Sequence, residues 1–243
     1  MRLIVLWVLA AGIVPAGAVA AAPPLTGFPF ADEAMSFKIS GPGGVVLGQT
    51  NLSARRGASG WAFELKADLG IPGFPVKDVY SSHTNSDFCS TEFIRETQHG
   101  SRKGREEETV DRSQETVTRA TISGGIGRGG KSDFAAPDCV KDALTMFYFA
   151  RQELGQGRVP SAQPILFGGL YDFSLTWAGA QTIQVGEKLV VTDRVNGLVN
   201  GPASRVEFEM YFARDPARTP LLVKIPLAVG SFSLELIDPE SSR

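Results

Sequence analysis

The chain has 243 residues, with 24 basic and 26 acidic side chains and a formal net charge of −2 at pH 7. This balance excludes the concentrated basic face that a nucleic-acid-binding protein needs, so we expect no nucleic-acid partner. Beyond the first 20 residues the chain is long enough for one sizeable core, and we expect a single β-rich domain over residues 21–243.

The N-terminus has the features of an export signal. Arg2 is followed by the apolar run LIVLWVLAAGIV, and small residues then lead to an Ala-x-Ala site at Ala18 and Ala20. A membrane anchor is the alternative, but the run is shorter than the about 20 residues that a spanning helix needs. We therefore predict a cleaved signal peptide over residues 1–20 and a mature protein in the periplasm or outside the cell. No later segment of the sequence is apolar for long enough to span a bilayer.

The two cysteines, Cys89 and Cys139, predict a disulfide. In an oxidising compartment an even pair favours one bridge, and closing a loop of about 50 residues is worth roughly 4 kcal/mol in the chain-entropy estimate. Two buried free thiols are the alternative. A metal site is disfavoured because the only histidines, His83 and His99, have no ligand spacing with either cysteine. We expect no metal and no cofactor.

From Phe37 onward most of the chain alternates apolar and polar residues or is rich in β-branched residues, as strands are. The glycine-containing residues 57–60 predict the turn of a hairpin between the first two strands. Residues 100–108 (GSRKGREEE) are charged and have no periodicity, which indicates a solvated hairpin tip. The strands predicted before the helix cover residues 45–52, 61–67, 76–82, 88–97 and 109–122.

Residues 125–132 match the phosphate-binding pattern GxxxxGK[ST] letter for letter. In a nucleotide-binding loop a helix follows at once and points its N-terminus at the phosphates. Here residues 133–137 (DFAAP) intervene before any helical pattern, and the neighbouring strands indicate an antiparallel arrangement. We therefore interpret the segment as a flexible loop and expect no nucleotide partner.

One segment, residues 138–157 (DCVKDALTMFYFARQELGQG), predicts a helix clearly, with its body at about 142–154. Asp138 or Asp142 can cap its start, and the two glycines can end it. Arg151 in its last turn is interpreted as a favourable partner of the helix dipole, and binding of an anionic head group is the alternative. The apolar face of this helix consists of Leu144, Phe147, Tyr148 and Leu154.

After the helix the strand pattern returns and continues to the C-terminus. Asn196-Gly197 and Asn200-Gly201 are strong turn dipeptides. The stretch DPARTP predicts a tight connection that an ion pair between Asp215 and Arg218 can lock. The strands predicted here cover residues 165–177, 182–195 (with an internal turn at 186–188), 206–212, 221–225 and 232–236.

The sequence contains no evident catalytic constellation. Nucleophilic catalysis pairs Ser or Cys with a base that is usually His, and we interpret His83 and His99 as solvated residues in a turn and at a strand end. A glycosidase-type carboxylate pair stays open, because the separation of its members is spatial. We assign no catalytic residue and expect a protein that is not an enzyme. Acids that alternate with apolar residues are interpreted as solvated; they include Glu207, Glu209 and Glu235.

Two segments of the chain resemble a known family. Residues 142–151 (DALTMFYFAR) are similar to its helix motif, close to DPLSALYYLR, and residues 211–221 (YFARDPARTPL) resemble its aromatic-xx-D-xx-R-x-P segment. With the exported N-terminus and the predicted hairpin, they resemble the domain of unknown function 3108 family over residues 30–237. The chain departs from the family at Ala143, where Pro is usual, and at Ala150, where Leu is usual.

The resemblance implies an exported bacterial envelope protein without an established activity. It also implies a mainly β fold, a large curved antiparallel sheet or open barrel with one principal α-helix. A looser similarity is to lipoprotein-carrier folds of the LolA and LolB type, but a shared fold does not establish function. Our first hypothesis is a binding or carrier protein for a lipid or another apolar or amphipathic envelope molecule. The alternatives are a structural or assembly factor that binds an envelope protein, and a hydrolase of envelope glycans or lipids.

Overall fold

The computed structural model describes residues 32–70, 73–123, 129–202, 204–228 and 230–237. The predicted signal peptide, residues 1–20, lies outside these ranges, as does the first half of the glycine-rich segment 125–132. No helix within the described ranges is both long enough and apolar enough to cross a membrane.

The described residues form one sheet of fifteen strands with one α-helix, so the mainly β prediction is confirmed. Neighbouring strands are antiparallel, and the exception is the parallel pair β9 and β10. The strands of the first half are β1 (Asp32–Ser40), β2 (Val46–Arg56), β3 (Gly60–Leu69), β4 (Val76–Asn85), β5 (Ser90–His99), β6 (Arg102–Asp111), β7 (Thr116–Ser123) and β8 (Gly130–Ala135). Those of the second half are β9 (Lys141–Asp142), β10 (Gln163–Leu166), β11 (Leu170–Val185), β12 (Lys188–Asn200), β13 (Arg205–Ala213), β14 (Pro220–Leu227) and β15 (Gly230–Leu236). The helices are the short 3-10 helix η1 (Pro42–Gly44) and α1 (Ala143–Gly155).

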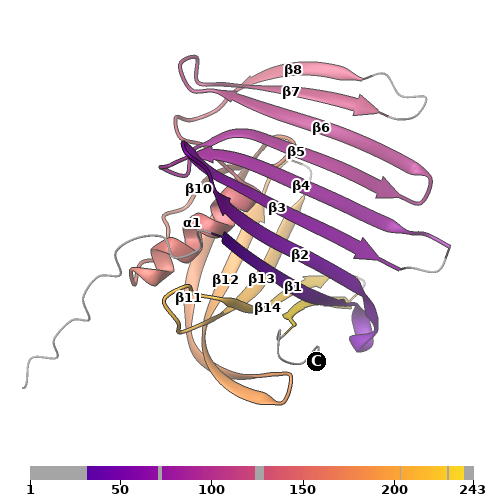
Figure 1. Ribbon diagram of the computed structural model, residues 1–243, viewed down its shortest axis with the longest axis vertical. Coiled ribbons are helices and arrows are strands. Elements are labelled where there is room, and N and C mark those ends of the chain that lie inside the picture. The colour runs from indigo at the N-terminus through magenta and orange to yellow at the C-terminus, as the bar shows by residue number, and fades with distance from the viewer. Residues whose placement is uncertain (1–31, 71–72, 124–128, 203, 229, 238–243) are drawn as a thin grey trace, which may run out of the picture.

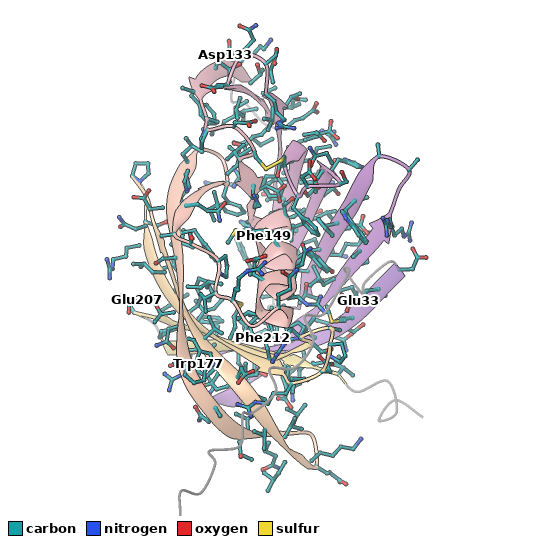
Figure 2. All side chains as sticks on the ribbon, turned by 90° about the vertical axis from the view of Figure 1, so that its left-hand side faces the viewer. Glu33, Asp133, Phe149, Trp177, Glu207 and Phe212 are labelled. Atoms are coloured by element: carbon teal, nitrogen blue, oxygen red, sulfur yellow. A yellow bond between two sulfur atoms is a disulfide. The ribbon has the colours of Figure 1, made fainter. Side chains whose placement is uncertain are left out.

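The sheet consists of two arms that meet at the β1–β15 pair. The first arm runs from β1 to β8 and the second from β15 back to β9, each strand beside the next one in the chain. The sheet is curved, and α1 lies inside the curve between the two arms (Figures 1 and 2). Most pairings are therefore local hairpins, and only the β1–β15 pair joins strands from opposite ends of the domain.

Helix α1 is buried on two sides, one against each arm. Leu144 and Tyr148 pack into the aromatic cluster of the first arm, where the Tyr148 ring stacks on Phe63 at 4.2 Å between centroids. Met146, Ala150 and Leu154 belong instead to the cluster of the second arm with Phe173 and Phe212. The predicted single apolar face was therefore too narrow: a helix enclosed by a curved sheet needs apolar residues on both sides. The helix fills the interior of the sheet.

Asp142, rather than Asp138, caps the start of α1. Its Oδ1 accepts hydrogen bonds from the backbone N–H groups of Leu144 and Thr145 at 2.9 and 3.0 Å. Its Oδ2 accepts from the hydroxyls of Ser82, Ser90 and Thr145 at 2.5, 2.6 and 2.7 Å. A buried carboxylate is tolerated because these five donors replace water.

The predicted disulfide between Cys89 and Cys139 is present, with 4.3 Å between the Cα atoms. It joins the residue before β5 to the segment that leads into α1. Next to it the backbone N–H of Ser90 donates to the carbonyl of Val140 at 2.9 Å. The entry of the helix is thus fastened to the first arm by a covalent bond as well as by the Asp142 cap.

Three local predictions were wrong. The charged residues 100–108 lie largely in β6, because their charges pair across strands: Arg105 contacts Glu96 on β5. The predicted long strand 109–122 is broken at residues 112–115, where Asp111 accepts the backbone N–H groups of Ser113 and Gln114. Asn196-Gly197 lies inside β12 instead of in a turn. A Cβ on Gly197 would lie 2.1 Å from the Phe208 ring, so this glycine leaves room for an aromatic neighbour.

The end of the segment 125–132 does not lead into a helix. Gly130 to Ser132 begin strand β8, which pairs antiparallel with β7, and α1 starts only at Ala143. A phosphate-binding loop requires a helix at that point. The described part of the segment therefore lacks the helix that such a loop needs.

A cluster of charges connects the two arms on the side of β6. In the turn between β10 and β11, the N–H of Gly168 donates to Glu108 Oε2 at 3.0 Å, and its carbonyl accepts from Arg119 Nη1 at 2.7 Å. Glu106 accepts hydrogen bonds from both Arg95 and Arg119. We call this contact of β5, β6 and β7 with the β10–β11 turn the arm bridge.

Glu108 is the buried acid of the arm bridge, with 1% of its surface exposed. Burial raises the pKa of its carboxyl to about 7, although the Gly168 N–H and the Arg95 charge oppose the rise. Between about pH 4.5 and pH 7, Glu108 is therefore protonated in the folded protein but ionised in the unfolded chain. The free energy of unfolding falls as pH rises through this window.

We expect Glu108→Gln to remove this pH dependence. Between pH 4.5 and pH 7.5 the free energy of unfolding of the wild type should fall, relative to that of E108Q, by on the order of 3 kcal/mol. Urea unfolding followed by circular dichroism at several pH values measures this difference. Glu107→Gln, on the opposite face of β6, should keep the wild-type slope. An unchanged slope in E108Q would contradict the assignment.

Candidate functional site

Neither histidine lies in an enclosed reactive site. His83 is on strand β4 rather than in the predicted turn, and its Nδ1 lies 3.1 Å from Glu92 Oε2. His99 ends β5, with its Nε2 2.9 Å from Asp78 Oδ1. Half of each side chain is exposed, as expected of solvated residues. Among the described residues, no hydroxyl is hydrogen-bonded to either ring.

No metal-binding cluster of His, Cys, Asp or Glu is found in the described ranges. The densest group of hydroxyls, around Asp142, is fully buried, and its members hydrogen-bond to one another and to the start of α1. These groups stabilise the helix and face no cavity that could admit a ligand. The candidate site must therefore be sought elsewhere.

Arg151 is buried near the end of α1, and none of its surface is exposed. Its two terminal nitrogens donate to both oxygens of Glu33 on β1, at 2.6 and 2.8 Å. Its Nε donates to the carbonyls of Ala217 and Arg218, at 3.3 and 3.2 Å. The sequence-based interpretation of Arg151 as a partner of the helix dipole did not anticipate these contacts. The alternative, binding of an anionic head group, would need an exposed guanidinium nitrogen, and Arg151 has none. Sequence spacing could not reveal this, because Glu33 lies more than a hundred residues away.

The two segments that carry the family resemblance meet at Arg151. The connection between β13 and β14, which contains Ala217 and Arg218, lies against the end of the helix. Within this connection Asp215 accepts the N–H and the hydroxyl of Thr219, at 2.9 and 2.6 Å, and so closes the turn. The predicted Asp215–Arg218 ion pair is absent. Arg218 instead contacts Asp193 on β12 at 2.6 Å, because its backbone has a positive φ of 48° that turns the side chain away.

A pocket of about 340 Å³ opens beside these residues, at the C-terminal end of α1. Leu154 of the helix and Phe212 of β13, both buried, form its apolar base, and the ring of Trp177 on β11 also lines it, with 55% of its surface exposed. Figure 2 shows Phe212 just beyond the end of α1, with Trp177 nearby on the second arm. The complete lining is Leu154, Gly157, Arg158, Val159, Trp177, Asp193, Phe212 and Arg218. We call it the helix-end pocket.

The polar side of the helix-end pocket is cationic. Asp193 is shared by Arg214 and Arg218, so two guanidinium groups balance one carboxylate. The Nε of Arg218 is buried without a hydrogen-bond partner among the described residues. Buried N–H groups are usually hydrogen-bonded, so this one is an exception. The pocket combines an apolar wall with the guanidinium groups of Arg158 and Arg218 and the carboxylate of Asp193.

Exposed apolar residues continue outward from the pocket along the β11–β12 ribbon. Leu189, Val191 and Asp193 alternate along β12 and so lie on one face, since strand side chains repeat every two residues. Leu189 and Val191 are exposed because β13 ends at Ala213, opposite Thr192, and does not cover them. The pocket is therefore the inner end of a longer apolar strip.

Comparison with known proteins identifies one family. The sequence pattern of the family described as "Protein of unknown function (DUF3108)" matches residues 36–237. No curated protein matches the sequence.

Two solved structures match the chain. One is a beta-barrel-like protein of domain of unknown function DUF1849 from Brucella abortus, with a TM-score of 0.64 and 6% identity over 87% of this chain and 98% of that one. The other is a protein with a YmcC-like fold from Bacteroides fragilis, with a TM-score of 0.29 and 5% identity over 84% of this chain and 95% of that one. At these identities the first similarity concerns the fold alone.

We expect Arg151→Leu to destabilise the protein by about 3–5 kcal/mol, because it leaves the Glu33 carboxylate and two carbonyls without their buried donor. Arg158→Leu, just beyond the same helix, is the matched control, since its exposed ion pair with Glu153 should contribute much less to stability. Urea unfolding measures both.

The double variant Arg151→Leu/Glu33→Leu should recover part of the loss, because it removes both charges together. Equal losses of stability in R151L and R158L would show that the buried contacts of Arg151 contribute no more to folding than the exposed Arg158–Glu153 ion pair.

Proposed function

The chain belongs to the DUF3108 family of proteins of unknown function, and we propose that it is an exported envelope protein that binds an amphipathic molecule at the helix-end pocket. The molecule inserts an apolar group between Trp177 and Phe212 and directs an acceptor group towards Arg218. Export is supported by the Cys89–Cys139 disulfide, since such bonds persist in oxidising compartments.

The observation that carries the proposal is the exposed Trp177 beside an apolar pocket with a buried unsatisfied donor. An indole that is half exposed loses little entropy on binding and buries a large apolar area. The pocket volume lies at the lower end of the range for small-molecule sites, which suits part of an acyl chain or one ring. The exposed strip of Val191 and Leu189 provides surface for the remainder of a longer chain.

The packing of α1 against both arms supports a ligand site outside the space between the arms. A carrier with a ligand-sized internal cavity would need space between α1 and the sheet, but α1 packs against both arms. The assembly-factor alternative has less support, because a sheet edge that recruits a partner strand is usually long and uncharged. Here the two edge strands are the six-residue β8, with Lys131 and Asp133, and the two-residue β9. No observation favours the hydrolase alternative.

Trp177 itself reports on the proposed site. Trp61 is buried, and the third tryptophan, Trp7, belongs to the predicted signal peptide. Titration of the exported protein with monomeric lysophosphatidylglycerol should shift the emission of Trp177 to shorter wavelength in a saturable way. By calorimetry, Trp177→Ala should weaken binding by about tenfold or more, which corresponds to about 1.4 kcal/mol.

The matched control is Phe74→Ala, an aromatic residue of similar exposure on a distant loop, which should bind the monomer as the wild type does. Absence of saturable binding, or an equal loss in F74A and W177A, would reject the helix-end pocket as the binding site.

A further inference from the structure

The exposed large apolar side chains are concentrated on one rim of the sheet. The described ranges contain nine such residues, and four of them lie at the helix-end pocket and its strip. The remaining five are Val45, Val46, Phe74, Ile122 and Leu227. We call these five residues the apolar rim.

Strand register shows that the apolar rim is continuous although its residues are far apart in sequence. Gly48 at the start of β2 pairs with Leu69 at the end of β3, and the start of β4 pairs with the end of β5. Ile122 near the end of β7 pairs with Arg105 near the start of β6. These strand ends lie together on the right-hand side of Figure 1.

The β14–β15 turn extends the rim on its other side. Leu227 pairs with Gly230 at this turn. A Cβ on Gly230 would lie 2.6 Å from Pro42 Cγ, so the turn lies directly against η1, which precedes Val45 and Val46.

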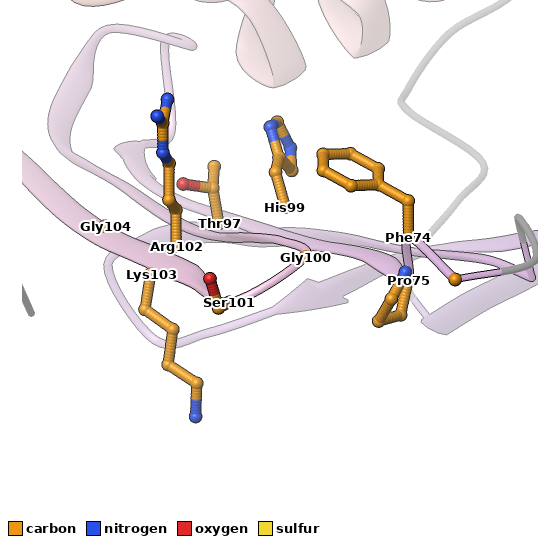
Figure 3. A pocket seen from close by; sticks show the side chains of 10 residues that line it. Phe74, Pro75, Thr97, His99, Gly100, Ser101, Arg102, Lys103 and Gly104 are labelled. Atoms are coloured by element: carbon orange, nitrogen blue, oxygen red, sulfur yellow. The ribbon is translucent and has the colours of Figure 1, made fainter.

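The Phe74 ring packs against a neighbouring turn at the rim. A Cβ on Gly100 would lie 2.9 Å from its ring, so the ring lies directly against the backbone of the β5–β6 turn. Phe74, Pro75 and the residues of the β5–β6 turn line an open groove of about 820 Å³ (Figure 3). His99 and Arg102 point to the same side as Phe74, and Lys103 points to the other.

The β5–β6 turn at this rim is cationic. The acids on the neighbouring strands have partners: Asp68 contacts Lys77 at 3.1 Å, and Asp78 contacts His99 at 2.9 Å. A further acid, Glu187, lies away from this turn, beside Val46. Arg102 and Lys103 have no carboxylate partner among the described residues, and both are exposed. The rim therefore complements an anionic surface.

The arrangement fits a membrane surface better than a folded protein. A protein partner usually covers a continuous apolar patch with a polar border. Here single apolar side chains lie at successive strand ends and turns along one edge, and β2 to β7 alone extend over about 24 Å at about 4.8 Å per strand. Single apolar residues along such an edge, with cations beside them, match the headgroup region of an anionic bilayer.

We propose that the apolar rim, together with Arg102 and Lys103, docks this protein on an anionic phospholipid surface. Phe74 and the valines enter the headgroup boundary, while the two cations contact lipid phosphates. The apolar rim shares no residue with the helix-end pocket, so either proposal can fail without the other.

The test is flotation of the exported protein with vesicles of phosphatidylglycerol and phosphatidylcholine in equal parts, compared with phosphatidylcholine alone. We expect binding to the anionic vesicles only, with a loss at about 0.5 M salt because the exposed charges are then screened. Arg102→Glu/Lys103→Glu should lower the vesicle partition coefficient by about tenfold or more. Phe74→Ser should lower it by about fivefold.

A matched variant separates this surface from general effects of charge. Arg55→Glu/Arg56→Glu reverses two adjacent cations at the opposite end of β2. It should bind vesicles as the wild type does, and circular dichroism confirms that each variant is folded. Failure of the wild type to bind anionic vesicles, or an equal loss in Arg102→Glu/Lys103→Glu and in this control, would overturn the proposal.

Discussion

Burying α1 between two arms of one sheet obliges the protein to satisfy the polar groups near both ends of that helix. At its start Asp142 receives hydroxyls from Ser82 and Ser90 of the first arm. Near its end Arg151 reaches Glu33 on β1 and the carbonyl of Ala217 between β13 and β14. Because these partners come from both arms, the same contacts that make the buried helix tolerable also fix the curvature of the sheet.

The burial of α1 bears on where a ligand can bind. Tyr148 packs on the first arm and Ala150 on the second, and the helix-end pocket lies at the end of the helix. Two surfaces remain, each with its own chemistry: the helix-end pocket offers an apolar wall and an unsatisfied donor, while the apolar rim offers separate apolar tips beside unpaired cations. A protein that takes up an amphipathic molecule and rests on a bilayer would use both.

Local patterns predicted what depends on neighbouring residues. The β2–β3 hairpin, the body of α1 and the turn at Asn200-Gly201 follow from alternation, spacing and turn chemistry. The errors occurred where a distant partner overrides the local preference. Gly197 stays in a strand because the Phe208 ring lies over it, and Arg218 leaves Asp215 for Asp193 on another strand. Trp177 reads in sequence as one more alternating residue, so its role at the pocket could not be predicted.

The sequence by itself determined the class of fold, the single helix, the cysteine pair and the family, because each rests on periodicity, composition or a contiguous motif. Only the tertiary structure decided that α1 fills the core, that Arg151 is buried against Glu33, and that apolar side chains gather at one pocket and one rim. The reason is physical: burial and charge pairing depend on residues brought together across the β1–β15 junction and the curve of the sheet. Their sequence separations carry no periodic signal.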